Sequence, residues 1–215
     1  FNFLNYTYIY NGGGVAVGDI NNDGLEDIYF TSNQNSNKLY LNKGNFVFED
    51  ITKRAHLEDE EGWTTGVTMV DINNDGWLDI YVCKSGSLKN RGARQNKLFI
   101  NQKNNKFKEE ALKYGLKESS FSTQAYFLDY DKDGDLDMYL LNNSFTPIDK
   151  LGYTNLREER DKLGGDKLFR NDSKDGKELH FTDVSETAGI YGSLIGFGLG
   201  ITIGDVNNDN WPDIY

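Results

Sequence analysis

One nine-residue acidic pattern occurs four times in this chain and limits what the chain can fold into. It reads DINNDGLED at 19–27, DINNDGWLD at 71–79, DYDKDGDLD at 129–137 and DVNNDNWPD at 205–213, and we call these stretches loops 1 to 4. Carboxylates packed this closely repel one another unless a cation lies between them. Four copies with the same spacing therefore indicate a set of cation-binding turns.

Side-chain oxygens recur at positions 1, 3, 5 and 9 of each loop, and calcium takes about six to eight such oxygen ligands at loose geometry. Position 6 is glycine in loops 1 to 3 and asparagine in loop 4, two residue types that tolerate the left-handed backbone of a sharp turn. We expect one structural Ca²⁺ per loop, up to four in total, with the carbonyl of position 7 as a further ligand. The predicted ligands are Asp19, Asn21, Asp23, Leu25 and Asp27; Asp71, Asn73, Asp75, Trp77 and Asp79; Asp129, Asp131, Asp133, Asp135 and Asp137; and Asp205, Asn207, Asp209, Trp211 and Asp213.

The loops are not EF-hands. An EF-hand loop needs a bidentate glutamate at position 12 and a helix on each side, whereas position 12 is Phe30, Val82 and Leu140 in loops 1 to 3. The flanking residues are short β-branched and aromatic runs, such as 15–17 before loop 1 and 28–30 after it, and these predict buried strands. Each loop therefore connects the two strands of a hairpin.

Two further elements recur after each of the first three hairpins, a K-L-[YF] run and a run that starts with phenylalanine. They begin at Lys38, Lys97 and Lys167 and at Phe48, Phe107 and Phe181. The loop starts are separated by 52, 58 and 76 residues, and repeats of this length with four antiparallel strands are propeller blades. We predict an all-β fold, a β-propeller of four-stranded antiparallel blades with calcium-binding hairpin loops, of which this chain holds about three and a half blades. The chain, 1–215, is then part of a single propeller domain.

The net charge of −11 is explained by the loops. Their predicted side-chain ligands include thirteen carboxylates, so the rest of the chain is close to neutral, and four Ca²⁺ would bring the net charge to −3. The acidity is thus a property of metal sites, and nucleic-acid binding has no electrostatic support. No apolar run approaches the roughly 20 residues of a transmembrane helix. The lone Cys83 lies in a predicted buried strand, where we expect it to pack rather than to react.

The repeats differ in length mainly between their second and third strands. From the ninth loop residue to the lysine of K-L-[YF], the separation is 11, 18 and 30 residues, and the longest connection contains the insertion 142–165. In a meander these connections lie at the opposite end of each blade from the cation loops. Insertions on one face of a repeat protein often form its binding face, and arginine and aromatic side chains often anchor interfaces. The candidate ligand-binding residues are Arg91, Arg94, Tyr153, Arg157 and Arg160.

The pattern apolar-x-x-G-D-Φ-N-x-D-G-x-x-D-Φ-Y, as in 15–29, resembles the FG-GAP/VCBS repeat of integrin-α-like β-propellers. The added N-K-L-Y-x-N and F-x-D-x-T elements, with 188–190 closing a repeat, are similar to bacterial proteins related to cartilage acidic protein. Those proteins often carry an ASPIC/UnbV segment further downstream, which is not visible in this sequence, and Asn210 departs from the loop glycine. The resemblance implies structural calcium and an exported protein, whether extracellular, periplasmic or on the cell surface. We expect the chain to be a piece of a longer protein.

The leading hypothesis is a calcium-stabilised, exported, non-enzymatic binding module that recognises a carbohydrate or a protein through the face opposite the cation loops. Two alternatives stay open: the propeller part of a polysaccharide-degrading enzyme such as a lyase, and a structural spacer. No G-x-S-x-G, H-E-x-x-H, Walker or dinucleotide pattern occurs. Neither His56 nor His180 has a recognisable catalytic partner, so we predict no catalytic residue in this chain.

Overall fold

The computed structural model describes residues 7–146, 152, 155–173 and 179–215. These residues form β-strands and two short 3-10 helices, η1 (Thr7–Tyr10) and η2 (Gly92–Arg94), so the prediction of an all-β fold is confirmed. None of the described helical segments has the length and apolar character that crossing a membrane requires.

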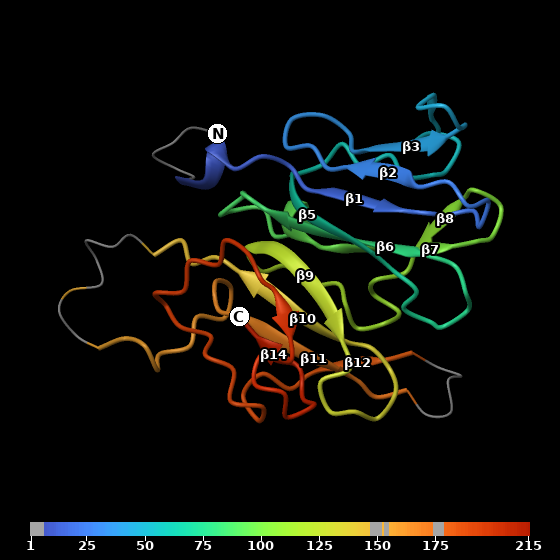
Figure 1. Cartoon of the computed structure of the whole chain (residues 1–215). Helices are drawn as coiled ribbons and strands as arrows, with labels where there is room; N and C mark the ends of the chain where they lie inside the picture. Colours follow the sequence, from blue (N-terminus) through green and yellow to red (C-terminus); the bar gives the residue numbers. More distant parts are fainter. Residues whose placement is uncertain (1–6, 147–151, 153–154, 174–178) are drawn as a thin grey trace. The chain divides into compact units, whose positions relative to one another are not determined.

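The chain divides into two compact units, unit 1 (Phe1–Ser119) and unit 2 (Ser120–Tyr215). Unit 1 holds two four-stranded antiparallel sheets whose strands are ordered as in the chain (Figure 1). The first sheet consists of β1 (Val15–Gly18), β2 (Asp27–Phe30), β3 (Lys38–Asn42) and β4 (Phe48–Asp50). The second consists of β5 (Trp63–Val70), β6 (Asp79–Ser85), β7 (Lys97–Asn101) and β8 (Phe107–Glu109).

Unit 2 holds one more four-stranded sheet and a two-stranded one. The larger sheet consists of β9 (Ser122–Leu128), β10 (Asp137–Asn142), β11 (Lys167–Asn171) and β12 (Phe181–Asp183), and the smaller of β13 (Ile203–Gly204) and β14 (Asp213–Ile214). The predicted four-stranded antiparallel repeat is therefore confirmed three times among the described residues. That the repeats form a single propeller domain stays a prediction.

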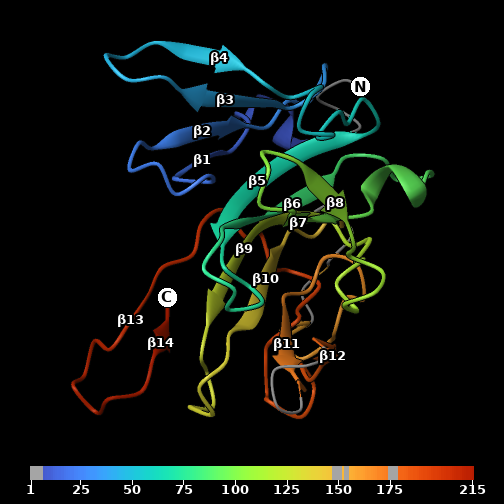
Figure 2. The same ribbon diagram turned by 90° about the vertical axis from the view of Figure 1, so that its right-hand side faces the viewer.

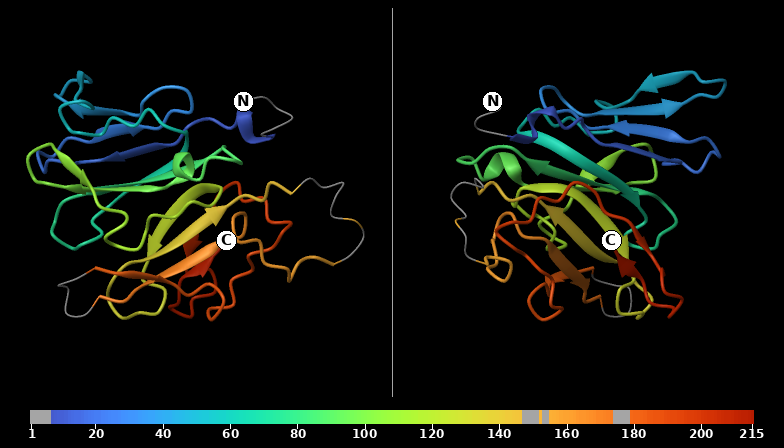
Figure 3. Two further views of the ribbon diagram at one scale, coloured as in Figure 1. Left: turned by 180° about the vertical axis from the view of Figure 1, so that it is seen from behind. Right: turned by 60° about the vertical axis from the view of Figure 1, so that its left-hand side comes forward.

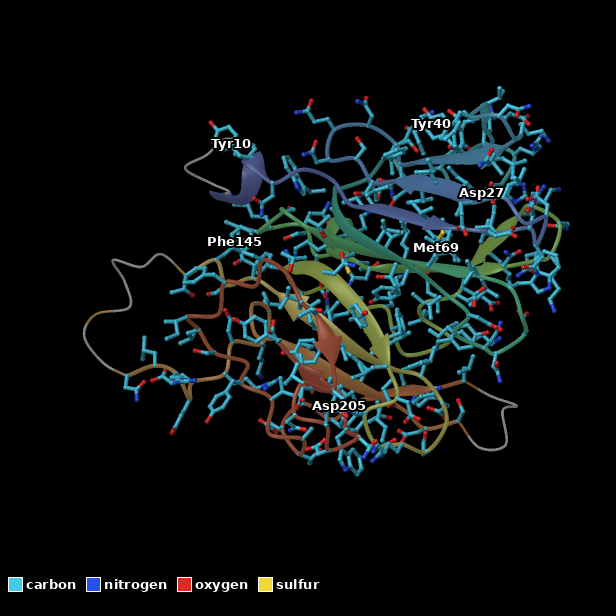
Figure 4. The ribbon with its side chains drawn as sticks, viewed as in Figure 1. Tyr10, Asp27, Tyr40, Met69, Phe145 and Asp205 are labelled. Atoms are coloured by element: carbon cyan, nitrogen blue, oxygen red, sulfur yellow. The ribbon has the colours of Figure 1, made fainter. Side chains whose placement is uncertain are left out.

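The core of unit 1 lies between its two sheets. Tyr29 and Leu39 of the first sheet and Ile80 of the second are fully buried in one hydrophobic cluster. Met69 packs against this cluster between the sheets (Figure 4), and β1 lies beside β5 (Figure 2). Because each large apolar side chain contributes about 1.5–3 kcal/mol on burial, this shared cluster holds the two sheets together as one unit.

Unit 2 has its own cluster, in which Tyr139, Leu141 and Leu168 of the larger sheet are buried. Ile201 and Ile203 pack against them, so the β13–β14 hairpin is attached through its first strand.

Cys83 of unit 1 is fully buried, and burial raises the pKa of its thiol. Its packing role is therefore as expected.

The cation loops and the longer connections lie at opposite ends of each four-stranded sheet. Loops 1, 2 and 3 join the first two strands of their sheets, whereas the variable connections join the second strand to the third. Figure 3 shows this for unit 2, where the β9–β10 loop and the described part of the β10–β11 connection leave the sheet at different ends. This geometry separates a candidate metal end from a candidate ligand end within each sheet.

Candidate metal sites

Within each loop, the aspartate at position 1 accepts hydrogen bonds from the backbone amides of positions 5 and 6. The N···O distances are 2.7–3.1 Å in all four loops. The donors are Asp23 and Gly24 to Asp19, Asp75 and Gly76 to Asp71, Asp133 and Gly134 to Asp129, and Asp209 and Asn210 to Asp205. These bonds wrap each turn around its first carboxylate.

Each turn needs two residues with left-handed backbone. Position 6 has φ of 83–97° at its three glycines and 66° at Asn210, in agreement with the residue types found there. Position 4 is also left-handed, with φ between 54° and 63°. Asparagine occupies position 4 in loops 1, 2 and 4, and Lys132 occupies it in loop 3. The three asparagines therefore carried a signal for this second left-handed position, which was not predicted.

The ninth aspartate is held by the neighbouring strand. Asp27, Asp79 and Asp137 are completely buried. Each accepts a hydrogen bond, at 2.7–2.8 Å, from the backbone amide of the asparagine that ends the third strand. These asparagines are Asn42, Asn101 and Asn171. The ninth ligand is therefore positioned by tertiary structure as well as by its own loop.

The side chains of these three asparagines bind the cation loop as well, and we call the backbone and side-chain bonds of each asparagine together the asparagine clamp. Their Nδ2 atoms donate to the carbonyl oxygen of loop position 8, at 2.9 Å to Glu26, 3.0 Å to Leu78 and 3.3 Å to Leu136. Sequence reasoning did not assign them a role. The recurrent N in K-L-[YF]-x-N was nevertheless visible, and it marks the residue that ties the third strand to the cation loop.

The oxygens of loop 3 fit a divalent cation. One carboxylate oxygen from each of Asp129, Asp131 and Asp137 lies within 4.8 Å of the others. Oxygens that share one calcium ion at about 2.3–2.6 Å lie no more than about 5 Å apart, so the three carboxylates are close enough to share one ion. Buried carboxylate oxygens without a hydrogen-bond partner occur at Asp131 Oδ1 and Asp135 Oδ1, and also at Asp79 Oδ2 of loop 2. Such atoms are costly to bury without a partner, and a cation would supply one.

The pKa values of several loop aspartates are raised, which also indicates that their ionised forms are destabilised when no cation is bound. Burial, followed by repulsion from neighbouring carboxylates, raises the pKa of Asp79 to about 7. The same two causes, in the same order, raise the pKa of Asp135 and of Asp137 to about 6. Burial is also the main cause that raises the pKa of Asp27. A calcium ion would favour the ionised form of each group.

Loop 4 has the same internal bonds but less support. Its residues are largely exposed, and its sheet has two strands among the described residues (Figure 4 labels Asp205). Asp213 accepts a bond from the amide of Val206, at 2.9 Å. The Lys132 ammonium of loop 3 lies 4.1 Å from the ring centre of Trp211. Loops 3 and 4 are therefore in contact within unit 2.

The β6–β7 connection contains two of the candidate ligand-binding arginines. Arg94 is only 4% exposed, and its guanidinium donates to the backbone oxygens of Ser87 and Ser119. Its side chain holds this connection in place, and the expectation that Arg94 binds a ligand stays a prediction. Arg91 is exposed, and its Nε donates to Ser119 Oγ at 2.9 Å.

The β10–β11 connection contains the other candidates. Arg157 is exposed, and its guanidinium carbon lies 5.3 Å from the ring centre of Tyr191, which is 64% exposed. Arg160 is half-buried and donates to two carbonyl oxygens, of Ile190 and Asp166, at 2.9 Å each. Arg160 thus fastens the connection to its surroundings. Tyr153 lies outside the described residues.

Comparison with known proteins identifies the repeat. The family model of the FG-GAP-like repeat matches residues 19–82, from loop 1 into β6. Cartilage acidic protein 1 of Xenopus tropicalis is 39% identical over 72 residues, which are 33% of this chain and 11% of that protein. The mouse protein of the same name is 36% identical over 69 residues (32% and 11%), and the human one 36% over 72 residues (33% and 11%). The matched segment thus spans about a tenth of these curated relatives.

Proposed function

Because this chain carries FG-GAP-like repeats, we propose that it is a calcium-stabilised, exported binding module without catalytic activity. It recognises a carbohydrate or a protein through the ends of its sheets that lie opposite the cation loops. The unpartnered buried oxygens of Asp79, Asp131 and Asp135 are the observation that supports calcium most strongly.

The side chains at positions 1, 3, 5 and 9 of each loop would hold one ion, with the carbonyl of position 7. Calcium supplies positive charge that cancels repulsion among these carboxylates, so its role here is to close the hairpin. The protein groups do the positioning, since the backbone amides fix the first carboxylate and the third-strand asparagine fixes the ninth in loops 1 to 3.

The proposed location of the protein follows from the calcium affinity expected of such loops. Extracellular calcium modules bind at Kd values of roughly 10⁻⁴–10⁻³ M, so loops of this kind are filled where calcium is millimolar. At twenty times the Kd, each filled site adds about 2 kcal/mol to the free energy of unfolding. An exported protein, whether extracellular, periplasmic or on the cell surface, gains this stabilisation.

Within unit 1, the candidate ligand end includes Arg91. Within unit 2, it includes Arg157 with Tyr191. An exposed arginine against an exposed aromatic ring is the kind of side-chain pair that anchors interfaces. Arg94 and Arg160 support these segments from within, since both donate to backbone oxygens.

A glycan array and a pull-down, both run with the whole chain in millimolar calcium, test the binding role. We expect Arg157→Ala with Tyr191→Ala to weaken capture of whatever ligand is found by at least tenfold, and Arg91→Ala to do so if the β6–β7 connection takes part. Lys43→Ala is the matched control, because this exposed residue follows β3 at the cation-loop end. Loss of binding in the control alone would show that the ligand binds at the cation-loop end instead. Absence of any ligand would favour the structural spacer.

A further inference from the structure

Asn101, the last residue of β7, contacts both cation loops of unit 1. Its side-chain Nδ2 donates to the carbonyl oxygen of Ile20 in loop 1 at 2.8 Å and to that of Leu78 in loop 2 at 3.0 Å. Its backbone amide donates to Asp79 Oδ1 at 2.7 Å. The residue is 3% exposed, so these bonds are shielded from water and each is costly to lose.

The contact with loop 1 goes beyond the clamp that each four-stranded sheet contains. Asn42 occupies the same place in the first sheet. Among the residues that the structure describes, its Nδ2 donates to Glu26 of its own loop alone, at 2.9 Å. The additional bond from Asn101 to Ile20 therefore serves the junction between two loops rather than the geometry of one.

The junction joins the ninth ligand of one loop to the ninth ligand of the other. The amide of Ile20 donates to Asp27 Oδ2 at 3.1 Å, and its carbonyl accepts from Asn101. Asn101 in turn donates from its amide to Asp79. A short path of hydrogen bonds thus runs from Asp27 to Asp79 through two residues.

A second hydrogen bond between loops 1 and 2 lies nearer to the surface. The Nδ2 atom of Asn22, at position 4 of loop 1, donates to the carbonyl of Gly76, at position 6 of loop 2, at 3.0 Å. Leu78 packs directly on β1, since a Cβ placed on Gly18 would lie 2.6 Å from Leu78 Cδ1. The two turns are therefore in contact through polar and apolar atoms.

We infer that loops 1 and 2 bind calcium cooperatively, with Asn101 as the positioning residue that couples them and Asn22 as a weaker second link. An ion in loop 1 orders Asp27 and, through Ile20, the side chain of Asn101. Asn101 then holds Asp79 in place before loop 2 fills, so that less ordering remains for the second ion. Coupling between sites is reciprocal, so filling loop 2 first assists loop 1 equally. This inference rests on the proposed calcium function.

Terbium, which replaces calcium, offers a way to read loop 2 alone, because Trp77 at position 7 of that loop can sensitise its emission. Trp211→Phe removes the equivalent tryptophan of loop 4. Trp63 stands at the other end of β5, about 23 Å from Val70 at about 3.3 Å per residue. Titration of the whole chain carrying Trp211→Phe, with excitation at a wavelength that tryptophan absorbs and tyrosine does not, therefore reports the affinity of loop 2.

The test is a double-mutant cycle in this background. Emptying loop 1 with Asp19→Ala and Asp23→Ala should weaken terbium binding at loop 2 about tenfold, which lies within the usual range for coupled sites. With Asn101→Ala already present, emptying loop 1 should have a much smaller effect, because the weaker link through Asn22 remains. Asn22→Gly removes the Nδ2 donor and keeps the left-handed backbone of position 4, so it should reduce the coupling in part. Asn42→Ala is the matched control, since it removes a clamp that does not reach loop 2.

The outcomes separate the coupling from the proposed function. If loop 2 binds terbium with the same affinity whether loop 1 is intact or emptied, the coupling is overturned while calcium binding stands. Coupling that survives Asn101→Ala combined with Asn22→Gly would overturn the role of these residues. Failure of the chain to bind terbium or calcium at all would overturn the proposed function itself.

Discussion

Loops 3 and 4 carry the same nine-residue pattern in the same unit, yet the structure supports them differently. In both, the first aspartate accepts the amides of positions 5 and 6. Asp137 of loop 3 is completely buried and accepts two further amides, from Tyr130 and Asn171. Asp213 of loop 4 is half-buried and accepts that of Val206.

The difference shows which part of a cation site is local and which is tertiary. The motif alone forms the turn, because the bonds around its first carboxylate recur wherever the motif occurs. In loops 1 to 3 the ninth aspartate, a proposed ligand, is also held by the asparagine of the third strand. Loop 3 also has four carboxylate ligands where loop 4 has three, so both support and charge favour the third loop.

The largest expected effect is from Asp137→Ala compared with Asp213→Ala. The first change removes a metal ligand and leaves two amides buried beside an apolar side chain, which costs about 3 kcal/mol or more. The second change acts on an exposed hairpin and should cost less than about 1 kcal/mol. Urea unfolding in millimolar calcium measures both, and equal losses would show that the third strand contributes nothing to the site.

Calorimetric titration should next rank the two loops by affinity. We expect loop 3 to bind calcium tightest and loop 4 weakest, with about tenfold or more between them, because Ca²⁺ affinity rises with ligand charge and site rigidity. Asp133→Ala should accordingly weaken binding more than Asn73→Ala in loop 2. Identical affinities in loops 3 and 4 would contradict the comparison.

The metal-free protein should lose stability as the pH rises through the range in which Asp135 and Asp137 of loop 3 ionise. The pKa of Asp135 and of Asp137 is about 6 in the folded chain, above the ordinary carboxyl value of 3.8. The folded state therefore holds more protons than the unfolded state between these values, and the free energy of unfolding falls as pH rises from about 4 to about 6. Melting curves in EDTA should show this decline. Millimolar calcium should remove it at the upper end of the range, where a decline of the same size would argue against an ion at loop 3.

The smallest expected effect is at position 6. Asn210 has φ of 66° where Gly134 has 97°, and glycine adopts such angles without the steric cost of a side chain. Asn210→Gly should therefore raise the stability of loop 4 by less than about 1 kcal/mol, whereas Gly134→Ala should lower that of loop 3 by about 1 kcal/mol or more. Hydrogen exchange of the two hairpins would detect both changes. A gain in stability from Gly134→Ala would show that position 6 does not require a residue suited to left-handed backbone.

The repeated motif predicted the hairpins, the four-stranded sheets and the left-handed position 6, because each depends on residues near one another in sequence. Features that depend on distant residues were not predicted. Asn101 reaches loop 1 across 81 residues. Buried Asp59 pairs with Lys84 at 2.9 Å, across 25 residues, and with Lys97 of the K-L-[YF] run at 2.8 Å, across 38 residues. The burial of Arg94 was also not predicted, because charge in a connection does not reveal burial. The clamp asparagines were visible in K-L-[YF]-x-N, but their meaning requires the register of the third strand.

The central claim is that calcium closes these hairpins, and thermal unfolding of the whole chain in EDTA and across a calcium titration tests it most directly. We predict that the Tm rises progressively as calcium reaches the millimolar range, and that the gain shrinks when the ligands of loop 3 are removed. Magnesium at the same concentration should give a smaller rise, because it demands a tighter octahedral site. A Tm that is the same in EDTA and in millimolar calcium would contradict the account.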